Sequence, residues 1–509
     1  MAIKIKWYTC RTMMMQGGLI LLALSWPADW WILAGAAAYL LAIVSVPSVL
    51  LQRRGNPRSA VSWLLVVFAL PGLGLFLWWV VGRKHLERQR HKRRVVANKM
   101  SSKFMQMRDG LVADSSKNLE LLPIERMPIE EAEWVFPSTV GNRVRLLVDA
   151  AQAYPAIETA IREAKENIHI AFYIWNNDAT GRQWRDLLIE KVREGVHVRL
   201  LLDGLGSRFA RRHHLLRPLI EAGGEGAFFL PMTLWSTRPT INFRNHRKIV
   251  VVDGCTGFLG GMNIGDEYQS DWHDLAVQIE GPAVDQLQET FVEDWYFATG
   301  KEVIAPQIFC HWQTPEGLAK LPKVDDDQAV CSILASGPHT PHNFTHDAMF
   351  LCLTQAQQRV YITTPYLIPE ESTMTALRTA VYRGVDVRLL VPANSDAWIV
   401  QWAGRSYYPD LLAAGIRLYE YNNGILHSKS VLIDDDLSIV GSANIDVRSF
   451  KLNFEAGCLA RSKPLARHLL DLFSRDLKQS REVTEDDLAR RSQLRQLADA
   501  AAHLLSPLM

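Results

Sequence analysis

The 509-residue sequence is poor in cysteine and carries almost no net charge. Its six cysteines include no C-x-x-C pair, which excludes a zinc-finger spacing and a dense disulfide framework. We therefore predict free thiols in a reducing compartment at Cys10, Cys255, Cys310, Cys331, Cys352 and Cys458. Lys and Arg total 56 against 54 Asp and Glu, so no global basic field favours nucleic acid as a partner.

Two long stretches near the N-terminus contain no charged residue. They span residues 32–51 and 60–81, which are 20 and 22 positions, and a helix needs about 20 apolar residues to cross a membrane. Tryptophans lie at the edges of both stretches, as in an interfacial aromatic belt: Trp30, Trp31, Trp78 and Trp79. We therefore expect a transmembrane helical hairpin. Two buried core helices are the alternative, which uncharged runs of this length disfavour.

Basic residues around the two spans predict their orientation. The N-terminal tail holds three positive charges and residues 83–94 hold seven, whereas the connecting loop holds three. Because two spans put both outer flanks on one side, the positive-inside rule places the rest of the chain in the cytoplasm. The shorter apolar stretch 17–26 is a candidate to enter the bilayer, and the sequence leaves this open.

After the anchor, short apolar strands alternate with amphipathic helices, the pattern of an α/β protein. The order strand, helix, strand occurs at 168–173, 184–194 and 196–202, and again at 360–363, 373–382 and 385–391. The sequences GVHVRLLLD at 195–203 and GVDVRLLVP at 384–392 are visibly related. We infer that a whole domain is duplicated.

The domain boundaries follow from these patterns. A basic segment separates the anchor from the first lobe, and a stretch with two prolines and three consecutive aspartates separates the lobes. The predicted boundaries are 1–82 for the anchor, 83–130 for the juxtamembrane linker, 131–312 for the first lobe, 313–330 for the second linker and 331–509 for the second lobe.

The most informative repeat is chemical. The pattern H-x-K-x-x-x-x-D occurs twice, and each time an asparagine follows after ten residues and an acid after eleven more. The first set is His246, Lys248, Asp253, Asn263 and Asp274. The second set is His427, Lys429, Asp434, Asn444 and Glu455. One copy would be weak evidence, but two copies with equal spacings predict one site built from both halves.

These residue types suit a phosphodiester. His and Lys two positions apart on a strand project from one face, and Lys with Asn can hold phosphate oxygens. A carboxylate bonded to an imidazole fixes its tautomer, a role expected for Asp274 and Glu455. One histidine can attack phosphorus while the other protonates the leaving alcohol. No metal or other cofactor is expected, because the lysines and asparagines supply the electrostatic stabilisation.

Several polar residues have a simpler interpretation. A lone histidine beside an apolar strand is usually only satisfied by its neighbours, and the matched spacing is what favours catalysis at His246 and His427. Asp253 and Asp434 belong to the repeated motif, but at a strand-to-turn junction each is better explained as holding the turn. His213, His214 and His273 have no duplicated partner, so we expect them at the surface or supporting the site.

The doubled motif identifies the chain as a member of the phospholipase D superfamily. The stretches NFRNHRKI at 242–249 and GGMNIGDEY at 260–268 resemble its bacterial cardiolipin synthase branch, as do IEGP at 279–282, SGP at 336–338, TPY at 364–366 and SPL at 506–508. This resemblance covers essentially the full chain. It implies two homologous lobes, each a mixed sheet flanked by helices, with the active site between them and a location in the bacterial inner membrane.

The resemblance also implies a reaction. A phosphatidyl group passes between two phosphatidylglycerol molecules through a phosphohistidine, giving cardiolipin and glycerol. By position His246 corresponds to the nucleophile and His427 to the general acid and later base, and the near symmetry leaves the opposite order open. The first copy has Gly260-Gly261 where the second has Gly441-Ser442, so a phosphate-binding role for Ser442 predicts unequal halves.

Other outcomes remain open from the sequence. A phospholipase D hydrolase, or a transphosphatidylase using phosphatidylethanolamine or another alcohol, would need the same residues. Two spans and a near-neutral charge argue against a nuclease, and two complete motifs argue against an inactive scaffold. The arginine- and aromatic-rich segment 207–245 either guides lipid toward His246 or packs as an ordinary helix and loop. The amphipathic run 488–505 is expected to dock on the second lobe.

Overall fold

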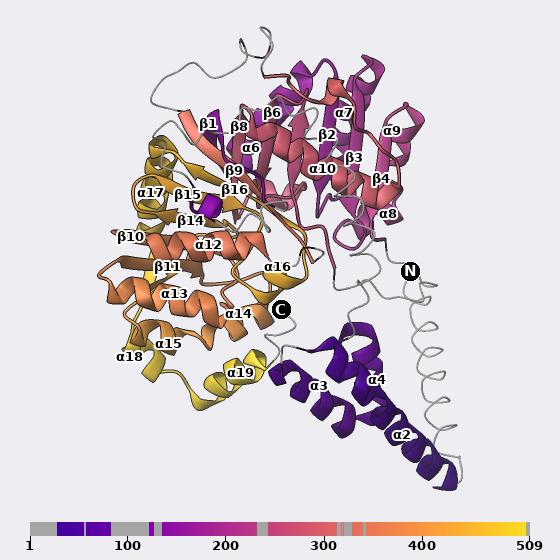
Figure 1. Ribbon diagram of the computed structural model, residues 1–509, viewed down its shortest axis with the longest axis vertical. Coiled ribbons are helices and arrows are strands. Elements are labelled where there is room, and N and C mark those ends of the chain that lie inside the picture. The colour runs from indigo at the N-terminus through magenta and orange to yellow at the C-terminus, as the bar shows by residue number, and fades with distance from the viewer. Residues whose placement is uncertain are drawn as a thin grey trace, which may run out of the picture. The chain divides into compact units, whose positions relative to one another are not determined.

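The computed structural model describes residues 28–54, 57–82, 122–126, 135–231, 243–312, 317, 319, 328–338, 340 and 343–504. These residues form two compact units, one built from the N-terminal helices and the other from both lobes (Figure 1). The basic flanks, the stretch 17–26, Trp235, most of both linkers and the C-terminal Ser-Pro-Leu lie outside the described residues.

The N-terminal unit contains α2 (Ala28–Gln52), α3 (Pro57–Ala69), α4 (Pro71–Leu77) and a π-helical turn (Trp78–Gly82). Within the described residues, Ile32–Gln52 is the one helix long and apolar enough to cross a membrane. The second predicted span is broken at Leu70, because Pro71 cannot donate a backbone hydrogen bond and begins a new helix. The predicted hairpin of two full spans is therefore only partly present.

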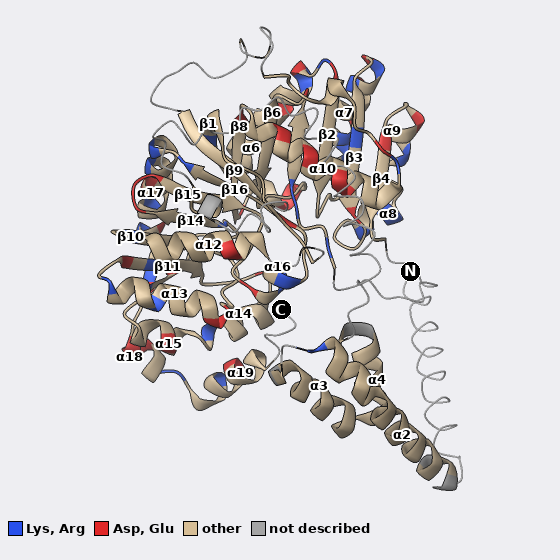
Figure 2. Ribbon diagram, in the orientation of Figure 1, with Lys and Arg blue, Asp and Glu red and all other residues tan. Residues whose placement is uncertain are grey.

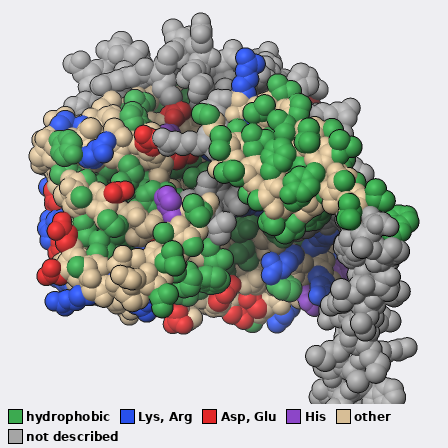
Figure 3. Space-filling view, turned by 90° about the horizontal axis from the view of Figure 1, so that it is seen from below, with side chains coloured by type: hydrophobic (Ala, Val, Ile, Leu, Met, Phe, Trp, Pro, Cys, Tyr) green, Lys and Arg blue, Asp and Glu red, His purple; other side chains and the backbone are tan. Residues whose placement is uncertain are grey.

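Apolar side chains cover the N-terminal unit. Figure 3 shows a visible surface of mostly hydrophobic atoms over these helices, and Ile32, Leu33 and Leu51 are at least 61% exposed. Trp79 is also exposed, but Trp78 is buried against Trp63, with 5.3 Å between ring centroids. Trp78 therefore serves packing and does not belong to an aromatic belt.

The second unit is organised around one 15-stranded mixed sheet, in which the two lobes meet at the antiparallel pair β1–β9. From edge to edge the strands of the first lobe are β4 (Glu225–Phe229), β3 (His197–Asp203), β2 (Asn167–Phe172), β5 (Ile249–Val252), β6 (Thr256–Gly260), β8 (Leu275–Glu280) and β1 (Thr139–Val148). The second lobe continues with β9 (Gln328–Ser336), β16 (Glu455–Arg461), β15 (Leu437–Gly441), β14 (Ser430–Ile433), β10 (Arg359–Thr363), β11 (Asp386–Pro392), β12 (Arg417–Tyr421) and β17 (Ser480–Val483). The equivalent order in the two halves agrees with the predicted duplication.

Helices cover both faces of this sheet (Figure 1). In the first lobe they are α6 (Asp149–Glu163), α7 (Ala179–Arg193), α8 (Arg208–Arg212), α9 (Arg217–Glu221) and α10 (Ala283–Thr299). In the second they are α12 (Phe344–Gln355), α13 (Glu371–Tyr382), α14 (Trp398–Arg405), α15 (Tyr408–Ala413), α16 (Val447–Lys451), α17 (Lys463–Lys478), α18 (Glu485–Ala489) and α19 (Gln493–His503). A separate two-stranded parallel pair joins β7 (Trp272–His273) to β13 (Ile425–Leu426).

Alternation along the strands divides the core. Ile168 and Ile170 pack with α6 and α7 on one face of the first lobe, whereas Ala171 belongs to the opposite face. That opposite core runs through both lobes and includes Phe291 of α10 and Leu469 of α17. Because one apolar core is shared, the two lobes form a single body on which a site between them can be held.

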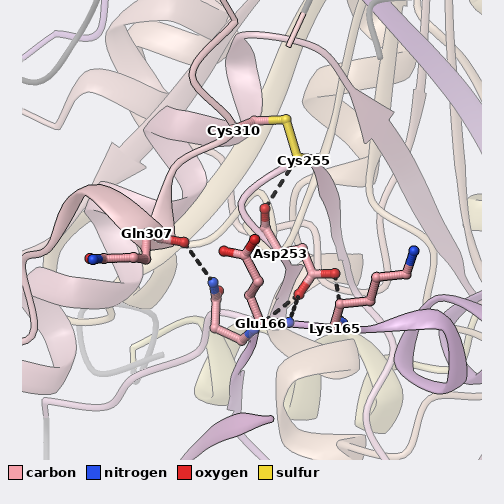
Figure 4. Close-up of a disulfide and its surroundings, with 7 residues drawn as sticks. Lys165, Glu166, Asp253, Cys255, Gln307 and Cys310 are labelled. Carbon is pink, nitrogen blue, oxygen red and sulfur yellow. Dashed lines mark hydrogen bonds between the residues drawn. A yellow bond between two sulfur atoms is a disulfide. The ribbon is translucent and has the colours of Figure 1, made fainter. Parts of the chain in front are cut away.

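A disulfide joins Cys255, just after β5, to Cys310, with Cα atoms 5.0 Å apart (Figure 4). The prediction of six free thiols is therefore wrong for this pair. The two cysteines are 55 residues apart, and only the return of the chain after α10 brings them together, so no sequence spacing could reveal the bond. Cys331, Cys352 and Cys458 are free and buried.

Candidate active site

The two repeated motifs occupy equivalent places in the sheet. His246 and Lys248 lie in extended backbone directly before β5, and His427 and Lys429 lie directly before β14. Each lysine Nζ donates to the carbonyl of its own histidine, at 2.7 Å in the Lys248–His246 pair. The histidines and lysines thus precede the buried strands that the sequence predicted and are not part of them.

Backbone contacts bind each histidine to the opposite half. The His246 amide donates to the Phe454 carbonyl at 2.9 Å, and the His427 amide donates to the His273 carbonyl at 2.8 Å. Phe454 and His273 are the residues just before Glu455 and Asp274. These backbone bonds therefore place each acid beside the histidine of the other lobe.

The side chains complete this crossing. His246 Nδ1 lies 3.0 Å from Glu455 Oε2, and His427 Nδ1 lies 2.5 Å from Asp274 Oδ2. The carboxylate side chains are 0% and 1% exposed, so both bonds form in a dry environment. Each carboxylate orients Nδ1 of its imidazole and leaves Nε2 for a reacting group.

Burial shapes the ionisation of the four motif residues. It lowers the pKa of His246 to about 4, against the pull of Glu455, and it lowers the pKa of His427 with help from Lys429. Burial also lowers the pKa of Lys248 to about 7 and that of Lys429 to about 8. Both imidazoles are thus neutral near pH 7, a state in which one of them can act as a nucleophile.

The two acids keep their charge. Burial opposes the carboxylate form, but the charge of Lys429 and the interaction with His427, including its hydrogen bond, outweigh it and lower the pKa of Asp274. In the same way His246 and Lys248 lower the pKa of Glu455. The charge of Lys429 also lowers the pKa of His246 and of Lys248, so the two half-sites act on each other.

The paired asparagines lie buried beside the motifs. The side-chain Oδ1 of Asn263 accepts from the Ile174 amide at 3.1 Å, and among the described residues its Nδ2 makes only a 3.4 Å contact with Tyr268. Asn444 Nδ2 donates to Asp446, and its Oδ1 has no hydrogen-bond partner among the described residues. Because each Nδ2 carries two N–H groups and makes one hydrogen bond among the described residues, each asparagine can still donate to a substrate oxygen.

Ser442 binds a protein carboxylate. Its hydroxyl donates to Glu455 Oε2 at 2.5 Å and accepts from the Ala456 amide at 3.0 Å. A Cβ at Gly261, the equivalent position, would collide with the carboxylate of Asp274. The difference between the halves therefore follows from the shorter acid in the first, and Ser442 helps to position Glu455.

Asp253 and Asp434 have equivalent structural contacts. The Asp253 carboxylate accepts the amides of residues 165, 166 and 167 at 2.8–2.9 Å, at the start of β2. Asp434 accepts those of residues 357, 358 and 359 at 2.7–3.0 Å, at the start of β10. Both have a φ of 51°, which a turn requires. These contacts correspond to the turn-holding interpretation of the sequence.

His273, whose role the sequence left open, supports the site. Its Nδ1 lies 2.8 Å from Asp149 Oδ1 and its Nε2 lies 3.1 Å from Asp476 Oδ2, so it links the two lobes. Burial alone would lower its pKa, but the bonds to two carboxylates raise it to about 10. The equivalent residue of the other half is Phe454, so the repeat gave no signal for it. His213 and His214 are exposed, as expected.

Aromatic rings border both imidazoles. Tyr173 lies 4.9 Å from His246 between ring centroids, and Trp272 lies 5.0 Å from His427. Tyr366 lies 6.5 Å from His427, and its hydroxyl donates to Asp396 at 2.8 Å. These aromatic rings lie against the two imidazoles. Tyr366 belongs to the TPY stretch noted in the sequence, whereas no pattern in the sequence indicated Tyr173 or Trp272.

The chain is also similar in sequence to known proteins. A family model described as "Cardiolipin synthase, PLD-like domain" matches residues 157–295 and 349–477, and one described as "Phospholipase_D-nuclease N-terminal" matches residues 37–83. The chain is 35% identical to cardiolipin synthase 1 of Bacillus cereus over 488 residues, which cover 93% of each chain. It is 36% identical to cardiolipin synthase A of Pseudomonas putida over 489 residues, which cover 92% of this chain and 97% of that one.

A solved structure shares the fold. Phosphatidylserine synthase of Haemophilus influenzae aligns with a TM-score of 0.55 and 15% identity, over 81% of this chain and 100% of that one. At this identity the likeness concerns the arrangement of the two lobes alone.

Proposed function

The chain belongs to the cardiolipin synthase family of the phospholipase D superfamily, and we propose that its two crossed histidine–carboxylate pairs carry out the phosphatidyl transfer. The reaction moves a phosphatidyl group between two phosphatidylglycerol molecules through a phosphohistidine and yields cardiolipin and glycerol. The observation that carries the assignment to these residues is the pairing of His246 with Glu455 and of His427 with Asp274 in one dry cluster.

In the first step, Nε2 of neutral His246 attacks phosphorus. The new N–P bond forms as the P–O bond to glycerol breaks, and the departing oxygen takes a proton from His427. The negative phosphate in the cleft supports the protonated form of His427, which Asp274 also stabilises. The assignment of His246 as nucleophile rests on its position in the chain.

In the second step, His427 acts as a base. It takes the proton from a free hydroxyl of the second phosphatidylglycerol, whose oxygen then attacks phosphorus while the N–P bond breaks. Lys248 and Lys429 hold the non-bridging phosphate oxygens, and Asn263 and Asn444 add neutral amide donors. Ser442 acts through Glu455 and does not hold the phosphate itself.

The substrates are phospholipids, and the apolar helix α2 supports membrane association. We infer that the chain crosses a bacterial inner membrane more than once, with the lobes on the cytoplasmic side. The support is the distribution of basic residues around the apolar stretches. Phosphatidylglycerol is the acceptor we favour, since the family reaction uses it twice.

One experiment tests the function. The full chain in phosphatidylglycerol vesicles is expected to produce cardiolipin and free glycerol in equal amounts, whereas His246→Ala and His427→Ala produce neither. Phosphatidic acid in place of cardiolipin would identify a hydrolase instead. Turnover only after phosphatidylethanolamine is added would identify a different acceptor. An alanine variant at His213, which is exposed and outside the site, is the control.

A further inference from the structure

A polar cavity lies in the second lobe, apart from the catalytic residues. It has a volume of about 420 Å³ and is bordered by α14, β12, β17, α18 and α19. Five arginines line it: Arg405, Arg481, Arg490, Arg491 and Arg495. None of the proposed catalytic steps uses this arginine pocket.

The pocket carries excess positive charge. Arg481 pairs with Glu420 at 2.9 Å and with Asp487 at 2.8 Å, and Arg491 pairs with Asp499 at 3.1 Å. Arg405 also pairs with Glu420, at 3.3 Å. The five arginines are therefore balanced by three paired carboxylates, which leaves two positive charges. Figure 2 shows the connection between α18 and α19 coloured blue for basic residues.

Three of the arginines have unused hydrogen-bond donors. No hydrogen bond or ion pair of the Arg490 and Arg495 side chains is present among the described residues, and both are exposed. Nε of Arg405 is buried and has no acceptor among those residues, although its Nη2 donates to the Ala393 carbonyl at 3.0 Å. Because guanidinium groups present planar pairs of N–H donors, this arrangement suits the oxygens of a phosphate group.

Helix α19, which contributes Arg495 to the pocket, also carries an exposed apolar surface. Leu494 and Leu497 of α19 and Leu504, which directly follows the helix, are 80%, 67% and 79% exposed, and their spacing places them on one face. On α14, which packs against α19, Trp398 and Trp402 are 57% and 38% exposed. Helix α19 does dock on the second lobe as the sequence predicted, through Ala502 and a 2.9 Å contact of His503, but its leucines face outward.

Helix α14 also leads to the catalytic residues. Asp396, two residues before its first turn, accepts the hydroxyl of Tyr366, whose ring lies beside His427. A helix face with leucines and tryptophans next to arginines has the composition of a surface that lies in a lipid interface. A free phosphate would use the arginines alone and leave the apolar residues without a role.

We propose that the arginine pocket and the leucines of α19 bind an anionic phospholipid of the bilayer, with the phosphate in the pocket and the acyl chains along the helix. This accessory site is separate from the catalytic one. It holds the second lobe against the membrane surface, so that the end of α14 near His427 faces the lipid supply.

Spectroscopy tests the contact directly. The full chain carries Leu497→Cys in a Cys10→Ser background and is labelled at 497 with an environment-sensitive dye while the Cys255–Cys310 disulfide is kept oxidised. It is reconstituted into vesicles of phosphatidylcholine with about one third phosphatidylglycerol. Acyl-brominated phosphatidylglycerol is expected to quench the dye more strongly than acyl-brominated phosphatidylcholine at the same mole fraction. The double variant Arg490→Glu/Arg495→Glu is expected to remove this difference, whereas Arg378→Glu/Arg467→Glu, which changes exposed arginines elsewhere in the lobe, is expected to retain it.

Activity separates this proposal from the proposed function. The Arg490→Glu/Arg495→Glu variant is expected to convert vesicle phosphatidylglycerol roughly tenfold more slowly, since each basic residue near an anionic surface contributes appreciably to binding. It is expected to convert monomeric short-chain phosphatidylglycerol at the unchanged rate. If the unmodified chain converted neither substrate, the proposed function would be refuted. The quenching experiment would then still test the accessory site, because it does not depend on turnover.

Three results would overturn the accessory site. Equal quenching by both brominated lipids would mean that the arginines select no anionic lipid. Loss of the difference in inorganic phosphate, but not in chloride of equal ionic strength, would identify a site for free phosphate. Slower turnover of the monomeric substrate by the double variant would place the arginines in the catalytic pathway.

Discussion

Asp274 lies in the first lobe, and its carboxylate binds His427 of the second lobe at 2.5 Å, whereas the histidine of its own motif is held by Glu455. The catalytic pairs therefore form only when both lobes are assembled. Since Asp274 and Glu455 act on different histidines, their removal is expected to affect different steps.

Substitution of the two acids tests this division. Asp274→Asn and Glu455→Gln are each expected to lower the rate with phosphatidylglycerol roughly 10²- to 10⁴-fold, because the imidazole loses its orientation and charge support. With a phosphatidyl ester of p-nitrophenol, which leaves without a proton, Asp274→Asn should still release p-nitrophenol in a first turnover and Glu455→Gln should not. Equal losses of p-nitrophenol release in both variants would contradict separate roles. Ser442→Ala, which removes a hydrogen bond to Glu455 only, is expected to reduce this release less than Glu455→Gln does.

His273→Gln is expected to destabilise the protein by roughly 3 kcal/mol, because it leaves two partly buried carboxylates without their cation. In the folded protein the pKa of His273 is about 10, above its ordinary value of 6.5, so this stabilisation is complete below pH 6.5 and is lost as pH rises through 10. The melting temperature of the native chain should thus fall across this range more steeply than that of the variant.

His273→Arg controls for the charge at this position. If the charge at position 273 helps to position His427, arginine should recover much of the turnover that glutamine loses. Removal of a different buried histidine, His169, which bonds Gln288 in the first lobe, should not alter the pH dependence of stability between pH 6.5 and 10. Identical melting behaviour of the glutamine variant and the native chain over this range would show that His273 carries no such charge.

The lysines predict the pH dependence of kcat/KM, which reports on the free enzyme. Lys248 and Lys429, with pKa values of about 7 and about 8, lose their charges as pH rises through these values, so phosphate binding should weaken above pH 8. The neutral form of His246 persists down to about pH 4, so the acid limb should lie near that value. Lys248→Arg should move the basic limb upward, because arginine stays charged. A profile that stays flat to pH 9 would contradict the lowered lysine pKa values.

Asp253→Ala is expected to affect stability far more than chemistry. Three backbone amides lose their acceptor, at a cost of roughly 2 to 4 kcal/mol, and the melting temperature should fall accordingly. The turnover of the folded protein below that temperature should stay within about twofold, since the carboxylate binds the start of β2. Asp434→Ala should behave alike. A large loss of turnover without loss of stability would assign a catalytic role to these aspartates.

The Cys255–Cys310 pair tests the orientation of the lobes. The disulfide of the structure and the cytoplasmic location proposed for the lobes make opposite demands, because a reducing cytoplasm keeps such a pair as thiols. If the lobes are cytoplasmic, a membrane-permeant maleimide that is added to intact cells and stays present while they are denatured should modify both cysteines, since denaturation exposes the buried Cys310. Protection of both, reversed by a reductant, would place the lobes on the oxidising side of the membrane and contradict the positive-inside prediction.

The sequence predicted the parts of the fold that depend on local pattern. Apolar alternation located strands β2, β3, β10 and β11 to within two residues, and equal spacings identified the motif residues, because duplication preserves distances along the chain. Pro71 within the second apolar stretch was visible as well, although its effect, a break into two helices, needed the structure.

What the sequence could not predict depends on contacts between distant segments. The spacing from His246 to Asp274 equals that from His427 to Glu455, so it suggests no exchange of acids between the halves. His273 has no repeated counterpart, and the arginines of the accessory site come from α14, β17, the connection between α18 and α19, and α19 itself. Such sites are defined by which surfaces meet, a property that local propensity does not encode.

The crossed pairs limit how such a chain can evolve. Neither half, if produced alone, would contain a histidine together with its own acid, so a truncated gene product could recover function only by pairing with a second copy. A single-copy ancestor would have met the same requirement and must have worked as a symmetric dimer. After fusion, a change at Glu455 affects His246, which is encoded more than 200 codons upstream, so the two halves of the gene are selected together.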